Sequence, residues 1–133
     1  MVFAGINYLA VIIAAIAGFA VGMGWYMMLG NAWMAALGKT KEELKPRPAP
    51  FIITAVALLV MAYVLAGMIG HMGAVTLWSG VISGTFVWAG FVATTIAINY
   101  AFQGAKSKLW LIDAGHFLAV LLVMGAVIGA FGI

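Results

Sequence analysis

Four long apolar runs without charge constrain this chain more than any other feature. They cover residues 3–29, 51–70, 77–102 and 109–131, and only Asp113 and His116 interrupt the last. A helix needs about 20 apolar residues to cross the hydrocarbon core of a membrane. Membrane barrels instead use alternating segments of roughly ten residues. The runs therefore predict an all-α fold, an integral membrane bundle of four transmembrane helices.

Composition supports a single transmembrane domain over residues 1–133. Hydrophobic residues make up 67% of the 133 residues and charged residues only 7%, too few to cover a water-exposed surface. The first run is long and no basic segment precedes it, so we interpret it as a retained helix rather than a signal peptide. The absence of cysteine excludes disulfides, thiolate metal sites and cysteine nucleophiles.

The basic residues predict the orientation in the membrane. They fall only in the first and third connections between runs: Lys39, Lys41, Lys45, Arg47, Lys106 and Lys108. Basic connections remain in the cytoplasm, so we expect both termini outside, most simply in a bacterial cytoplasmic membrane. The small excess of +3 does not suggest a nucleic-acid partner. The partner that the composition predicts is the lipid bilayer.

The segment 31–38, between the first two runs, predicts a short helix of its own. Asn31 is a helix-capping residue at its start, and Gly38 is suited to end it. We expect this segment to lie in the membrane interface, anchored by Trp33. Partner recognition is the less favoured interpretation.

Pairs of glycines four residues apart predict close helix contacts. Such pairs let two backbones approach within a membrane, and the chain has three of them: Gly18 and Gly22, Gly80 and Gly84, and Gly125 and Gly129. Some must serve internal packing. The spacing leaves open whether one remains for self-association or for docking into a larger membrane complex.

Asp113 and His116 are the main chemical signal. They are three residues apart and thus share one face of the fourth helix, where a carboxylate in lipid costs roughly 3 kcal/mol. The candidate ligand or proton site adds polar and aromatic residues expected at the same depth: Thr95, Asn99, Gln103, Trp25 and Tyr26. The alternative is structural, with Asp113 paired to Lys108 and Asn99 clamping two helices.

Enzyme and cofactor templates are absent from the sequence. It has no GxSxG, HExxH, P-loop or GxGxxG motif. One Asp and one His are too few for a zinc site, so no metal or cofactor is expected. Aromatic residues near the predicted interfaces, including Tyr100 and Trp110, are assigned to aromatic belts and to no chemistry.

Several motifs resemble a family of small bacterial membrane proteins known as domain of unknown function 1761. They are Gly22-x-x-Trp25-Tyr26, Gly30-x-x-Trp33-Met34-x-x-x-Gly38, Gly90-Phe91-Val92 through Asn99-Tyr100, and Leu111-Ile112-Asp113-Ala114-Gly115-His116. Met27-Met28 replaces the Ser-Pro expected after Trp-Tyr. The resemblance implies a four-helix membrane protein and no assigned activity.

Three functions fit the sequence. The favoured one is a non-enzymatic membrane protein that self-associates or is an accessory subunit of a larger complex. The alternative is a small transporter or channel whose hydrated path is lined by the face around Asp113 and His116. The third, and least favoured, is a membrane enzyme that uses these two residues as an acid-base pair.

Overall fold

The computed structural model describes residues 5–132 and, within them, contains helices and no strands. The helices are α1 (Tyr8–Leu37), α2 (Pro48–His71), α3 (Leu77–Val87), the π-helix η1 (Trp88–Val92), α4 (Ala93–Gln103) and α5 (Ser107–Phe131). Because α3, η1 and α4 run on without a break, the described residues form four helices long and apolar enough to cross a membrane. The predicted all-α class and the four membrane helices are confirmed.

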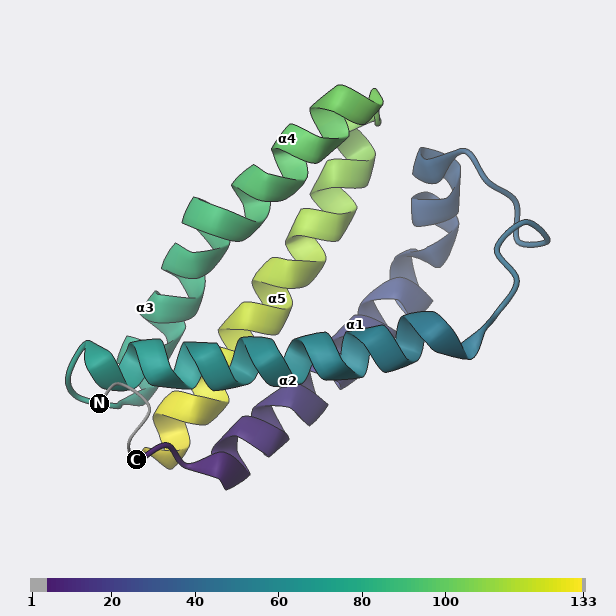
Figure 1. Cartoon of the computed structure of the whole chain (residues 1–133). Coiled ribbons are helices and arrows are strands. Elements are labelled where there is room, and N and C mark those ends of the chain that lie inside the picture. Colours follow the sequence, from purple (N-terminus) through teal and green to yellow (C-terminus); the bar gives the residue numbers. More distant parts are fainter. Residues whose placement is uncertain (1–4, 133) are drawn as a thin grey trace.

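The helices alternate in direction. Figure 1 shows the start of α1, the end of α5 and the α2–α3 turn at one end of the molecule. The connections 38–47 and 104–106 lie at the other end, where α1 and α2 diverge from α4. The six basic residues thus lie at one end of the bundle.

Local capping sets the helix ends. The Asn7 side chain accepts a hydrogen bond of 3.1 Å from the Ala10 amide, so α1 begins at Tyr8. The predicted start at residue 3 lies outside the described residues. Gly38 ends α1 with φ +76°, a left-handed conformation that glycine adopts without strain.

The segment 31–38 is not the separate short helix that the sequence predicted. Helix α1 continues through Asn31 to Leu37, because nothing at Gly30 or Asn31 breaks the backbone hydrogen bonds and the following residues have good helix propensity. Trp33 is half-buried and its ring packs edge-on against Tyr26, with ring centroids 5.6 Å apart. Its predicted role as an interface anchor stays a prediction.

Helix α5 is the centre of the bundle, and it packs most extensively against α1 and α3. The largest side chains that are fully buried include Val120, Leu121 and Met124 on α5, together with Ile69 on α2. Helix α2 makes most of its contacts with α1 and few with α5. This uneven packing leaves room beside α5 at the level where α1 and α2 diverge.

All six predicted packing glycines lie against other helices of the same chain. A Cβ on Gly80 would lie 1.9 Å from the Gly125 carbonyl oxygen, and one on Gly129 would lie 2.1 Å from that of Thr76. The other four would meet α3 or α5 atoms at 2.9 Å or less: Gly84, Gly125, Gly18 and Gly22. These glycines bring α1 and α3 onto α5 and leave none of the three pairs free for self-association.

The contact between α3 and α5 gives a stability prediction. Gly125→Ala would place a methyl group against the Gly80 carbonyl, so the helices must separate, and we expect a loss of about 1–3 kcal/mol in unfolding free energy. Gly24→Ala is the matched control, since a Cβ there meets nothing within 4 Å. Unfolding titrations in mixed micelles followed by circular dichroism measure both. Equal stability of the two variants would contradict the proposed contact.

Candidate functional site

Asp113 lies at the point where α1, α4 and α5 meet. Its side chain is buried, with 8% exposed. The Tyr26 hydroxyl donates a hydrogen bond of 2.6 Å to one carboxyl oxygen, and the Tyr100 hydroxyl donates one of 2.5 Å to the other. Polar groups in the membrane interior must be satisfied within the protein. The two tyrosines therefore hold the carboxyl and tie three helices together.

Tryptophans brace the backbone on both sides of Asp113. The Trp25 indole donates a hydrogen bond of 3.0 Å to the Ile112 carbonyl, and the Trp88 indole donates one of 2.7 Å to the Ala114 carbonyl. These carbonyls belong to the residues directly before and after Asp113. Side chains from α1 and from the π-helix thus hold the α5 backbone in register, and we call Trp25, Tyr26, Trp88 and Tyr100 the aromatic clamp.

His116 lies one helical turn beyond Asp113, between two aromatic rings. Its ring centroid is 4.9 Å from that of Tyr26 and 4.5 Å from that of Phe117. A Cβ on Gly22 would lie 2.9 Å from Nε2 of His116, so only glycine leaves the imidazole room beside α1. Nδ1 is buried, and within the described part of the chain it has no hydrogen-bond partner.

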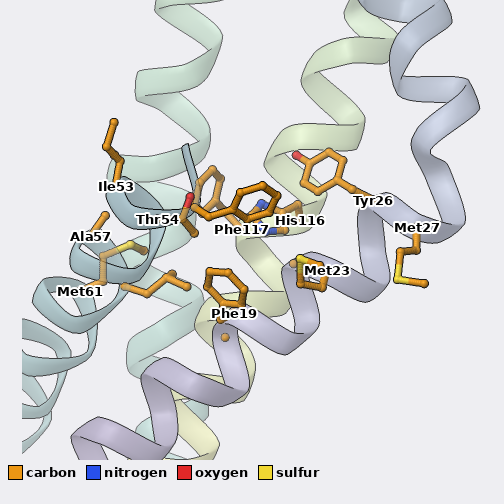
Figure 2. Close-up of a pocket in the computed structure, with 14 residues that line it drawn as sticks. Phe19, Met23, Tyr26, Met27, Ile53, Thr54, Ala57, Met61, His116 and Phe117 are labelled. Carbon is orange, nitrogen blue, oxygen red and sulfur yellow. The ribbon is translucent and has the colours of Figure 1, made fainter. Parts of the chain in front are cut away.

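A cavity of about 550 Å³ lies beside His116, between α1, α2 and α5. Figure 2 shows His116 and Phe117 with the α2 side chains Ile53, Thr54, Ala57 and Met61 on one side and the α1 side chains Met23, Tyr26 and Met27 on the other. Further lining residues are Gly18, Phe19, Gly22, Phe51 and Leu58. Met27 and Ile53 are 80% and 67% exposed, so the cavity opens on the lipid-facing surface of the bundle.

The structure brings together four of the seven predicted site residues: Trp25, Tyr26, Asp113 and His116. The other three, Thr95, Asn99 and Gln103, are exposed on α4. Instead of meeting Asp113, the Thr95 hydroxyl donates a hydrogen bond to the Phe91 carbonyl of its own helix.

The π-helix η1 explains why those three residues are displaced. The prediction assumed regular α-helical steps of three and four residues along the third run. The wider π turn at Trp88–Val92 adds a residue and rotates everything after it. The inward face then passes through Ala93, Ile96 and Tyr100, so that Ile96 and Tyr100 point inward in place of the expected Thr95 and Asn99.

Tyr100 is the main residue that sequence reasoning missed, because it was assigned to an aromatic belt. Its position contained a usable signal. Tyr100 and Asp113 both lie within two helical turns of the tight connection at 104–106, so they share a depth in neighbouring antiparallel helices. Lys108, the partner considered for Asp113, is exposed instead.

The site separates into two parts with different chemical capacity. Each oxygen of Asp113 accepts a hydrogen bond from a tyrosine hydroxyl, so this carboxyl has its partners within the bundle. Among the described residues no group of three or more His, Asp or Glu could hold a metal ion. His116 differs, since it lines the cavity and its ring makes no hydrogen bond to the described residues.

The aromatic clamp yields a prediction for Tyr100. Tyr100→Phe removes one donor and leaves a buried carboxyl oxygen without a partner, so we expect a loss of roughly 1–3 kcal/mol in unfolding free energy. Tyr8→Phe is the control, because Tyr8 is 60% exposed and keeps its ring stacked on Tyr63. Micelle unfolding compares the variants, and a Tyr100→Phe protein as stable as the control would show that the clamp does not hold the bundle.

Comparison with known proteins places the chain in a family. Neither a curated protein nor a solved structure matches it. The model of the family described as "Protein of unknown function (DUF1761)" matches residues 9–129, which include all four membrane helices apart from their outermost residues and both parts of the site. The chain therefore belongs to the DUF1761 family.

Proposed function

We propose that this chain is a non-enzymatic integral membrane protein that takes a lipophilic molecule from the bilayer into the cavity beside His116. In this role it would serve a larger membrane complex as an accessory, ligand-holding subunit. The observation that carries the proposal is the lateral cavity of about 550 Å³, which is lined by three helices and opens toward lipid.

The cavity's size and lining support a ligand site. Its volume falls within the roughly 300–1,000 Å³ typical of small-molecule pockets, which are mostly apolar with a few placed polar groups. Here phenylalanine, methionine and aliphatic side chains form most of the wall, and His116 adds a polar group. Because the opening faces lipid, a membrane-dissolved molecule can enter without crossing water.

Transport through a hydrated path has weaker support. The polar residues expected to line such a path, Thr95, Asn99 and Gln103, lie exposed on α4 and away from Asp113. The Asp113 carboxyl is closed off by Tyr26 and Tyr100. A conducting route would have to break these contacts.

Self-association has less support from the structure than from the sequence. The glycines of all three pairs pack against other helices of the same chain. Large side chains remain exposed on α4 and η1, where Phe102 is 91% and Phe91 71% exposed. In our proposal these side chains face lipid or a different subunit.

Filling the cavity should block ligand entry. Ala57 lines the cavity on α2, so Ala57→Phe would occupy part of it. The probe is a phospholipid with a photoreactive diazirine near the end of its acyl chain, used with the protein in nanodiscs. We expect labelling concentrated in residues 18–27 and 51–61 and a several-fold decrease in Ala57→Phe, measured by peptide mass spectrometry.

Ala55→Phe is the matched control for this experiment. Ala55 is also exposed on α2 but does not line the cavity, so labelling should remain unchanged. Labelling spread evenly over all lipid-facing residues, or equal in the two variants, would overturn the proposed function.

The proposed orientation places both termini outside a bacterial cytoplasmic membrane. The chain has no cysteine, so a single introduced cysteine shows directly on which side of the membrane its position lies. We expect a membrane-impermeant maleimide to label His71→Cys in intact cells and Glu42→Cys only after permeabilisation, because the basic connection 38–47 stays in the cytoplasm. The reverse pattern would invert the orientation.

A further inference from the structure

We infer that the cavity binds a neutral quinone-type molecule, a flat ring with carbonyl oxygens and an apolar tail, with one ring oxygen accepting a hydrogen bond from His116. This inference rests on the proposed function and names its ligand class. It combines the depth of His116, the donors that remain available in the cavity, and the aromatic side chains around the imidazole.

The depth of His116 in the membrane favours a ligand with a neutral head group. His116 is nine residues beyond Ser107, the first residue of α5, which is about 14 Å along the helix. With Ser107 taken at the boundary of a hydrocarbon core about 30 Å thick, the imidazole lies near the middle of that core. No Lys or Arg lines the cavity, so a phosphate or carboxylate at this depth would lack a counter-charge, whereas a carbonyl oxygen needs only one donor.

The donor must come from His116. Three polar side chains line the cavity, and two have committed their hydroxyl protons: Tyr26 to Asp113, and Thr54 to the Pro50 carbonyl at 2.6 Å. The imidazole makes no hydrogen bond to the described residues, and of its two nitrogens Nδ1 is buried out of reach of a ligand. Nε2, on the side of the cavity-lining Gly22, is therefore the ring nitrogen that a ligand oxygen can reach, and an N–H left without an acceptor in the membrane interior costs free energy.

The surrounding side chains favour a flat ring over an alkyl chain next to His116. Tyr26 and Phe117 flank the imidazole, and Phe19 lies close by in the same cavity (Figure 2). Aromatic rings pack well in offset and edge-on arrangements, and the sulfurs of Met23 and Met61 add favourable contacts with a ring. The tail then leaves through the opening toward Met27 and Ile53.

The test compares two probes with the same tail, of which only the first has carbonyl oxygens: a benzoquinone with a decyl tail, and decylbenzene. Each competes with the photoreactive phospholipid for labelling of residues 18–27 and 51–61. We expect His116→Leu to weaken competition by the quinone about threefold to tenfold, the value of one hydrogen bond, and to leave decylbenzene unchanged. His116→Gln keeps a donor and should restore most of the quinone affinity.

The outcomes separate this inference from the proposed function. If His116→Leu weakens competition by both probes equally, the substitution disturbs the cavity itself. If it leaves competition by both probes unchanged, His116 does not contact the ligand. Either result overturns the inference. A cavity that is labelled by lipid but binds the quinone no better than decylbenzene also overturns it and leaves the proposed function standing. If the phospholipid does not label the cavity of the unmodified protein, both the proposed function and this inference are overturned.

Discussion

The carboxyl group of Asp113 in the membrane interior is the constraint on which the rest of the structure depends. Water is not available there, so each polar atom requires a partner from the protein. Tyr26 and Tyr100 provide two, from helices on either side of α5. The geometry of these bonds fixes how α1 and α4 rotate about α5, and the indoles of Trp25 and Trp88 hold the adjoining carbonyls.

The same rotation produces the cavity. With Tyr26 directed at Asp113, the next inward position on α1 toward its start is Gly22, which leaves room for His116. On the opposite side of the bundle, backbone contact through Gly80 and Gly125 draws α3 tightly onto α5. Helix α2 has no equivalent contact with α5, and this difference in packing leaves the space that opens to lipid.

The sequence was sufficient to predict the fold because membrane helices are defined by length and apolarity, which are local properties. It was also sufficient to single out Asp113, His116, Trp25 and Tyr26, since polar residues within apolar runs require partners. It did not reveal the π-helix, which depends on tertiary contacts such as the Trp88 indole bond, so Asn99 was placed where Tyr100 lies. The cavity arises from the divergence of two helices, which no local pattern records.

The distribution of the clamp along the chain also has a consequence for biogenesis. Tyr26 is synthesised with α1 and Tyr100 with α4, and the carboxyl that both contact follows only with α5. A lone Asp within a membrane helix opposes insertion, by roughly 2.5–3.5 kcal/mol where it lies at the helix centre. The hydroxyl partners that α1 and α4 supply offset this cost, so insertion of α5 is coupled to its docking onto the helices that precede it.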